Sequence, residues 1–183
     1  MKRFIIICIC CLVAGCNGKQ DDTSLISTAI PYLGYAERTH RNELQELTGV
    51  DPVRTEWCAA FINSVLEESG IEGSASVSNY PLTARSFLKW GVGVDSNDIA
   101  IGDIVVFPRG NQGWQGHVGF YLRTEEINGI AYYWILGGNQ RNKVSVVRYK
   151  QSSVLGIRRS QILVDNRDKM SYNNRVLGNL LRR

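Results

Sequence analysis

The sequence has few of the residues that would build a metal site or a disulfide framework. Five of the 183 residues are cysteine and two are histidine. Four of those cysteines, at positions 8, 10, 11 and 16, lie in the first 16 residues, and Cys58 is the only one after them. Cys58 therefore lacks a neighbouring thiol for a disulfide and companion ligands for a zinc site. We expect no metal ion and no other cofactor.

The chain also lacks long apolar runs and a strong excess of one charge. The apolar run over residues 4–13 is shorter than the roughly 20 residues that a membrane-spanning helix needs. The formal net charge is +4, with 21 basic and 17 acidic residues. Two of the basic residues lie at positions 2 and 3, and without them the excess falls to two (19 against 17). This is too weak for a nucleic-acid-binding surface, and we expect no nucleic-acid partner.

The first 16 residues, MKRFIIICICCLVAGC, combine a basic start, a short apolar run and small residues before Cys16. This order is typical of a secretory leader. Its end resembles that of bacterial lipoprotein leaders, in which the bond before the cysteine is cut and the thiol is lipidated. The resemblance implies a signal peptide over residues 1–15, lipidation of Cys16 and a polar linker over residues 16–24. A plain secreted protein and an uncleaved anchor are the alternatives.

The lipid anchor implies a place in the cell envelope. Asn17 follows the cysteine, whereas an Asp there often marks retention at the inner membrane in the enterobacterial lipoproteins that the leader resembles. We therefore expect attachment to the outer membrane, facing the periplasm. We also expect the protein to be a monomer.

Residues 25–159 are predicted to form one domain whose helices precede its strands. Helical spacing covers residues 25–38, with interruptions at a proline and a glycine, and then residues 41–48, 56–69 and 83–90. Short runs typical of strands cover residues 103–107, 117–123, 131–139, 143–149 and 154–158. This order predicts an α+β domain with an antiparallel sheet of about five strands. Residues 160–183 form a basic tail in which residues 176–181 could line a short helix.

Cys58 falls in the first turn of the helix predicted over residues 56–69. Thr55 is the expected N-cap, and the apolar stripe that includes Cys58 is expected to face the sheet, with Asn63 and Ser64 on the wet face. Unpaired backbone N–H groups at a helix start favour a thiolate and can stabilise an oxyanion. We interpret Cys58 as a nucleophile, and a buried apolar filler is the alternative.

The two histidines lie in different settings. His40 lies in a polar stretch and is expected to be an exposed bystander. His117 opens a predicted strand directly after the glycine-rich loop over residues 110–116. Paired with a lone thiol at a helix start, His117 is the predicted general base.

A third polar residue usually orients such a base. If the hairpin between residues 117–123 and 131–139 has an even register, His117 and Asn139 point the same way and Gln140 points away. A β-bulge would reverse that choice. We favour Asn139 as the orienting residue, with Gln140, Glu37 and Asp103 as alternatives; Asp103, after a glycine, better suits a turn or a strand edge.

These segments together resemble the papain-like NlpC and CHAP families of bacterial cell-wall hydrolases. The resemblance is carried by WCAAF at residues 57–61, ARSFLKWG at 84–91, GDIVVF at 102–107, GHVGFY at 116–121 and GGNQ at 137–140. The order of cysteine, histidine and polar residue is the same, and a poorly characterised bacterial and phage subgroup is closest in pattern. The chain departs from the NlpC pattern at residues 59–60, where two alanines replace Ser-Gly.

The resemblance implies a papain-like fold and cleavage of a peptidoglycan amide by Cys58, His117 and Asn139. The bond is either an endopeptidase site in the peptide stem or cross-bridge, or the amide that joins the stem to N-acetylmuramic acid. A non-catalytic wall-binding lipoprotein on the same fold, and an acyltransferase or antibacterial toxin with the same thioester chemistry, are the alternatives.

Overall fold

The computed structural model describes residues 24–162 and residue 165. The predicted leader, the lipidation at Cys16 and the short helix over residues 176–181 all lie outside the described residues. None of the helices in the described part of the chain combines the length and the apolar character that crossing a membrane requires.

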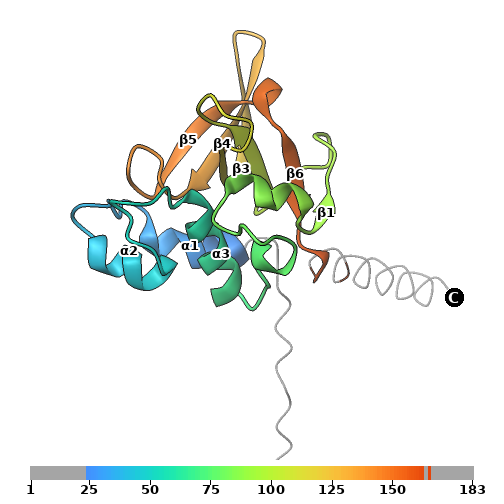
Figure 1. Cartoon of the computed structure of the whole chain (residues 1–183). Coiled ribbons are helices and arrows are strands. Elements are labelled where there is room, and N and C mark those ends of the chain that lie inside the picture. The colour runs from blue at the N-terminus through green and yellow to red at the C-terminus, as the bar shows by residue number, and fades with distance from the viewer. Residues whose placement is uncertain (1–23, 163–164, 166–183) are drawn as a thin grey trace, which may run out of the picture.

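Three α-helices and most of the short 3₁₀ turns precede the main strands along the chain (Figure 1). The α-helices are α1 (Ser24–Ala29), α2 (Arg41–Thr48) and α3 (Cys58–Glu68). The 3₁₀ helices are η1 (Ile30–Tyr32), η2 (Ser74–Ser76), η3 (Ala84–Lys89) and η4 (Gln151–Ser153). The strands are β1 (Val92–Gly93), β2 (Ile104–Pro108), β3 (Gly116–Ile127), β4 (Ile130–Gly137), β5 (Ser145–Lys150) and β6 (Gly156–Arg159).

The six strands form one antiparallel sheet in the order β1-β6-β2-β3-β4-β5. The α-helices gather at one end of the strands, and the β3–β4 hairpin projects at the other (Figure 1). The predicted α+β class with an antiparallel sheet is therefore confirmed. The predicted count of about five strands misses β1, because a two-residue edge strand is too short to show an alternating pattern.

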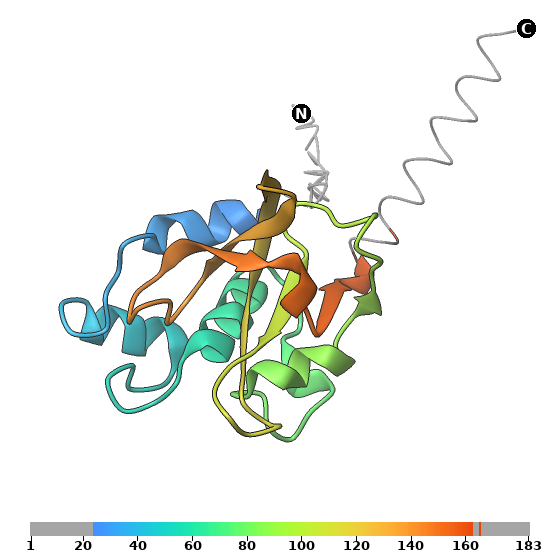
Figure 2. The same ribbon diagram turned by 90° about the horizontal axis from the view of Figure 1, so that it is seen from above.

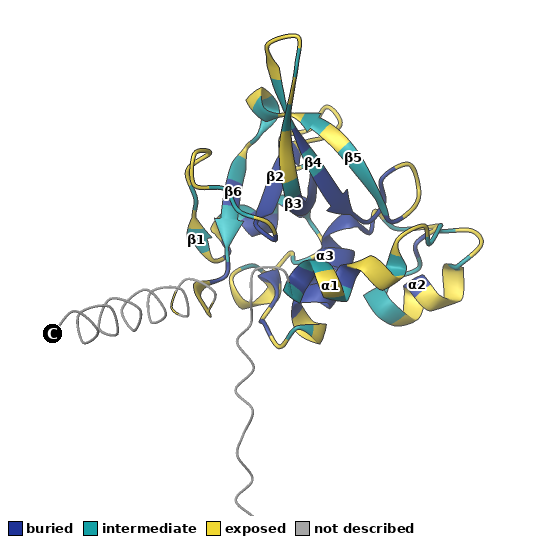
Figure 3. Ribbon diagram, turned by 180° about the vertical axis from the view of Figure 1, so that it is seen from behind, coloured by how far each residue is buried: buried dark blue, intermediate teal, exposed yellow. Residues whose placement is uncertain are grey.

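Alternating residues on the strands serve two separate apolar clusters. Val106 and Phe120 point to the larger cluster, which also contains the buried side chains of α3. Phe107, Tyr121 and Tyr133 belong to a smaller cluster on the opposite face of the sheet. Figure 3 shows the buried residues concentrated in α3 and the central strands. Helix α3 thus packs on one face of the sheet, the face of the larger cluster.

Helix α3 is buried more completely than its sequence pattern predicts. Every residue from Cys58 to Leu66 is buried, including Asn63 and Ser64, so the predicted wet face at those two positions is wrong. Both polar side chains are satisfied inside the fold. Asn63 accepts from the Ser74 backbone N–H at 2.7 Å and donates to the Pro81 carbonyl at 2.9 Å, and the Ser64 hydroxyl donates to the Ala60 carbonyl. A polar residue on a helix usually indicates a solvent-facing side. Here the loop after α3 supplies hydrogen-bond partners to Asn63, so this side chain is buried.

The start of α3 presses against the chain that leaves β4. A Cβ on Gly138 would lie 2.6 Å from Cβ of Phe61 and 2.7 Å from the Trp57 ring, so only glycine fits there. The helix begins at Cys58, with Trp57 at the N-cap position and no side-chain cap, and the prediction that Thr55 caps it is wrong. The N-cap side chain therefore accepts none of the first-turn N–H groups of α3, which lie next to the end of β4.

Two other predicted helices are shorter than expected. The helix predicted over residues 25–38 ends at Ala29 and passes into the 3₁₀ turn Ile30–Tyr32, where the proline lies in the first turn. The helix predicted over residues 83–90 is the 3₁₀ helix Ala84–Lys89. In the view from above in Figure 2, α1 and η3 lie on different sides of α3. Residues 41–48 form α2 as predicted, and Gly49 ends it in the left-handed conformation.

Candidate active site

Cys58 is the first residue of α3 and is only 4% exposed, so it faces the sheet as predicted. It is the free cysteine of the described residues. Its sulfur accepts hydrogen bonds from the backbone N–H groups of Ala59 and of Val118. Val118 follows His117 in β3, so the thiol reaches the sheet one residue away from the predicted base.

His117 is the second residue of β3 and is 2% exposed. Its partner across the sheet is Phe107, so its ring lies on the sheet face of the smaller apolar cluster. The ring of Tyr149, from β5, stacks on His117 with centroids 5.3 Å apart and also stacks on Phe107 at 4.5 Å. Packing therefore fixes the plane of the imidazole.

Gln140 binds the imidazole and determines which of its nitrogens carries the proton. Its amide nitrogen donates to the backbone carbonyls of Ile135, Gly137 and Ser145, which fixes the orientation of the amide group. The amide oxygen then faces His117 Nε2 at 3.2 Å and accepts its N–H. In the neutral ring the other nitrogen, Nδ1, holds the free lone pair. That Nδ1 is buried and has no hydrogen-bond partner among the described residues, which leaves it available as a base.

Asn139 does not bind the imidazole, and the expectation that it would is wrong. Near His117 the register is even, as assumed, because Tyr121 pairs with Ile135; the bulge in β3 lies further toward the hairpin. The prediction fails because β4 ends at Gly137 and Asn139 adopts a left-handed backbone, with φ of 53°. Its side chain turns away and donates to Glu56 Oε2 at 2.7 Å. Gln140 takes the position by folding back onto the strand ends.

Burial keeps both reactive groups neutral. It raises the pKa of the Cys58 thiol above its ordinary value, against the opposing effect of the Arg109 guanidinium and the N–H groups of Val118 and Ala59. Burial, together with the positive charge of Arg109, lowers the pKa of His117 to about 4, although the Gln140 hydrogen bond favours the protonated ring. The Ala59 N–H at the start of α3 lowers the thiol pKa as predicted, but desolvation outweighs it, so the pKa is raised and the expected thiolate is not favoured. The pair is poised as thiol and imidazole.

Three side chains form a polar bridge over this pair. The Arg109 guanidinium lies 3.3 Å from Glu56 Oε2, and it also donates to the Asn139 carbonyl at 3.4 Å. Because Asn139 Nδ2 binds the same Glu56 oxygen, one carboxylate holds two donors. The Glu56 side chain is 77% exposed and that of Arg109 is 42% exposed, so this bridge is weakly held and easily exchanged.

A pocket of about 220 Å³ opens beside His117. Its lining joins the end of β2, the loop after β4 and strand β5. The lining includes Arg109, His117, Arg141 and Tyr149. His117 is one of the residues that line the pocket, and no residue of α3 lines it.

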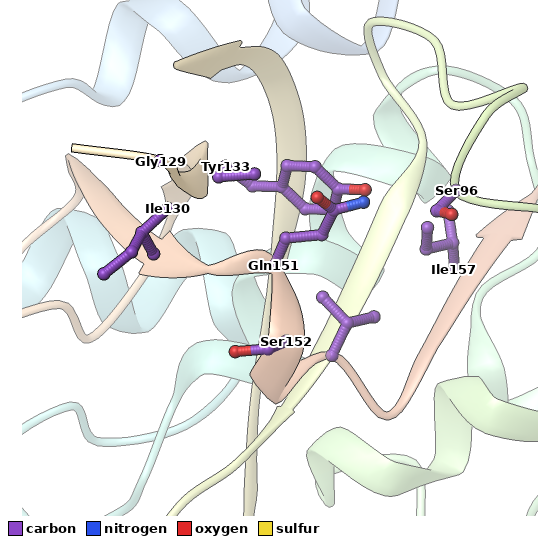
Figure 4. Close-up of a pocket in the computed structure, with 9 residues that line it drawn as sticks. Ser96, Gly129, Ile130, Tyr133, Gln151, Ser152 and Ile157 are labelled. Atoms are coloured by element: carbon purple, nitrogen blue, oxygen red, sulfur yellow. The ribbon is translucent and has the colours of Figure 1, made fainter. Parts of the chain in front are cut away.

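A larger cavity, of about 580 Å³, lies at the hairpin end of the sheet. Figure 4 shows the ring of Tyr133 and the side chain of Gln151 pointing into it with their polar ends together. Its lining contains no acidic or basic residue, histidine or cysteine. This cavity offers shape but none of the groups that acid–base or nucleophilic chemistry needs.

The remaining candidates have structural roles. His40, expected to be exposed, is half-buried: it stacks on Tyr35, bonds the Thr39 hydroxyl and accepts the Ala36 N–H, all in the segment before α2. Asp103 accepts two hydrogen bonds from Arg159 of β6, and Glu37 contributes a backbone N–H to the loop after β4. No group of three or more acidic, histidine or cysteine side chains within residues 24–162 is arranged to hold a metal ion.

Sequence reasoning missed Arg109, Glu56 and Tyr149, and ranked Gln140 second. The Gly137-Gly138-Asn139 run could have indicated that the strand ends early. Paired glycines weaken a strand, and asparagine tolerates the left-handed region. If the strand ends before Asn139, the alternation of side chains along the strand no longer predicts where Asn139 points. No family model matches this chain, and no curated protein matches it significantly.

Proposed function

We propose that this protein is a papain-like cysteine hydrolase of the NlpC/CHAP type that cleaves an amide bond of peptidoglycan. The observation that carries the proposal is the buried, unpartnered Nδ1 of His117, in a ring held by Gln140 and one residue before Val118, whose backbone N–H acts on the thiol of Cys58. A merely structural histidine would have both ring nitrogens satisfied, because an unpaired buried polar atom costs about 1–3 kcal/mol.

Catalysis begins with the neutral pair. As the Cys58 sulfur bonds to the carbonyl carbon of the scissile amide, the thiol proton passes to Nδ1 of His117. The Gln140 oxygen stabilises the resulting imidazolium through Nε2–H. We assign stabilisation of the oxyanion to backbone N–H groups at the start of α3, where no N-cap side chain competes for them.

The acyl-enzyme forms when the C–N bond breaks. His117 gives its proton to the leaving amine nitrogen, and a thioester joins the substrate acyl group to Cys58. Water then attacks the thioester and His117 takes one water proton. The C–S bond breaks, His117 returns that proton to the sulfur, and the acid product leaves and loses its own proton to the solvent. An amine in place of water would give transfer, with the same residues in the same roles.

The substrate assignment is supported by the sequence motifs, which resemble those of cell-wall hydrolases, and by the predicted lipoprotein leader. We further propose that lipid on Cys16 holds the protein at the envelope. Incorporation of a labelled fatty acid into the expressed protein tests this: labelling should disappear in Cys16→Ala, and unchanged labelling in that variant would exclude Cys16 as the anchor.

The hydrolase proposal is tested with purified peptidoglycan. Wild-type protein and Cys58→Ala are incubated with it, and the released fragments are identified by mass spectrometry. We expect new amine and carboxyl termini at one amide bond with the wild type and none with Cys58→Ala. Circular dichroism confirms that both proteins are folded, and equal release by both would refute the catalytic role of Cys58.

A further inference from the structure

The pocket beside His117 has a lining that carries two positive charges and no negative ones. Arg109 reaches it from the end of β2, and Arg141 reaches it from the loop after β4. Val147 and Tyr149 supply an apolar wall from β5. Two guanidinium groups that converge on a small pocket next to a catalytic base favour an anionic ligand group.

Both guanidinium groups act on the same wall of the pocket. Burial raises the pKa of the Tyr149 phenol to about 12, while the charges of Arg109 and Arg141 both oppose that rise. The two charges are therefore close enough to this ring to act together on whatever occupies the pocket. Tyr149 also stacks on His117, so an occupant would lie directly beside the base.

Glu56 shows how a carboxylate is held at the rim of this pocket. Its Oε2 lies 3.3 Å from the Arg109 guanidinium and accepts a hydrogen bond of 2.7 Å from the Asn139 amide. Because Glu56 is largely exposed, an incoming carboxylate can replace it without a large loss of stability. The same donors are then available to a ligand.

The loop that carries Arg141 has a strained backbone. Asn139, Arg141 and Asn142 have φ values of 53°, 55° and 63°, in a region that arginine seldom adopts. The loop is held by the Gln140 N–H on the Lys143 carbonyl at 3.0 Å and by bonds to residues 34–37. Such strain is concentrated at functional sites, where the surrounding structure holds a side chain in place.

We propose that this pocket binds a free carboxylate of the peptide substrate next to the amide that Cys58 attacks, through Arg109 and Arg141. The inference rests on the proposed function and names its specificity: acidic muropeptides are substrates and their amidated forms are poor ones. At about 220 Å³ the pocket is smaller than the roughly 300–1,000 Å³ of sites for larger ligands, and it suits one short acidic side chain.

The test compares two forms of one substrate pool. Soluble muropeptides are used either unchanged or after their carboxyl groups have been converted to amides with carbodiimide and ammonia. Binding is measured by equilibrium dialysis against Cys58→Ala, which removes turnover, and cleavage is measured with the wild type. We expect unchanged muropeptides to be retained and cleaved at least about tenfold better than amidated ones, which is the loss of about 1.4 kcal/mol of interaction.

The variants locate the preference. Arg109→Gln and Arg141→Asn, each combined with Cys58→Ala, should reduce the preference to less than about threefold; asparagine is chosen at position 141 because it tolerates the left-handed backbone. Glu56→Gln, which removes the internal carboxylate, should raise retention of unchanged muropeptides. Arg54→Gln is the matched control, since Arg54 is 81% exposed and pairs with Asp51, and it should retain the full preference.

The outcomes separate this inference from the proposed hydrolase. Equal binding and cleavage of both pools by the folded protein would overturn the carboxylate pocket and leave the hydrolase intact. Selective binding of unchanged muropeptides without cleavage by the wild type would support the pocket and overturn the hydrolase. A preference that persists in both arginine variants would also overturn the pocket as described.

Discussion

The pocket beside His117 and the cavity at the hairpin end of the sheet adjoin the same apolar cluster, yet they differ in what lines them. The hairpin cavity is the larger, at about 580 Å³ against about 220 Å³, but it contains only uncharged groups such as Tyr133 and Gln151. The smaller pocket contains a buried base with a free nitrogen and two cations. The volume of a pocket therefore does not show where a reaction can occur. Hydrogen-bond donors, acceptors and charges that line the pocket are the better indication.

The two regions also use glutamine in different ways. Gln140 has its amide nitrogen tied to backbone carbonyls, so its oxygen has a single direction. Gln151 lies in the turn η4 and lines the larger cavity. Substitutions of matched residues in the two regions therefore test whether function depends on the pocket beside His117 and not on the hairpin cavity.

The largest expected effect is at the base. His117→Ala should lower kcat/KM for peptidoglycan about 1,000-fold, because no other described side chain is placed to take the thiol proton. Tyr133→Phe, in the larger cavity, should stay within about twofold. The check is a rate of fragment release at several substrate concentrations, and a large loss in Tyr133→Phe would move the active site to the hairpin end.

The stability of the fold should decrease in acid because of His117. Its pKa is about 4 in the folded protein and near 6.5 when unfolded, so between these values the unfolded state binds a proton that the folded state does not. The contribution of His117 to stability is therefore constant above about pH 6.5, and it falls as the pH drops toward 4, by up to about 3 kcal/mol. Urea unfolding at a series of pH values measures this slope.

A variant separates this effect from other acid titrations. His117→Gln removes the titrating ring, and its slope between pH 6.5 and 4 should be smaller than that of the wild type. Identical slopes in the two proteins would mean that His117 is not buried in its neutral form.

The orienting role of Gln140 gives the next effect. Gln140→Ala should lower kcat about 10–100-fold with little change in KM, because the imidazole loses the acceptor that fixes its proton on Nε2. The matched Gln151→Ala should remain near wild-type activity, and Asn139→Ala should lose less than about fivefold. Nitrogen chemical shifts of His117 provide a second readout: the Nε2–H tautomer should dominate in the wild type and become mixed in Gln140→Ala.

The smallest expected effect tests the contact between α3 and the end of β4. Gly138→Ala would place a methyl group 2.6–2.8 Å from Phe61 and Trp57, which should cost about 1–2 kcal/mol of unfolding free energy. Gly113→Ala is the control, because no atom lies within 4 Å of the added methyl group there. Thermal denaturation of both variants measures the difference, and equal stability would show that the start of α3 can move away freely.

The sequence predicted the parts of this fold that depend on local pattern. Helix α2, the burial of Cys58 and the five longer strands follow from periodicity and turn residues. The burial of Asn63 could not be predicted, because its partners lie 11 and 18 residues away in an irregular loop. The raised pKa of the thiol could not be predicted either, because desolvation depends on the packing of the whole domain.

The candidate site was predictable in its two principal members and not in its surroundings. Cys58 and His117 were singled out because each is rare in the chain and lies at the start of an element. Asn139 and Gln140 are adjacent, and their order of preference depended on where β4 ends, which is a boundary that sequence patterns place only to within a few residues. The position of Arg109 in the site could not be predicted, because a single arginine after a strand is typical of the protein surface.

The burial of Cys58 has a consequence for how readily this residue is oxidised. Oxidants such as peroxide attack the thiolate, and the ladder from sulfenic to sulfonic acid begins with that species. Cys58 is 4% exposed as a residue and its thiol has a raised pKa, so it presents very little thiolate to the solvent. Burial therefore slows the chemical ageing of this thiol in an oxidising environment.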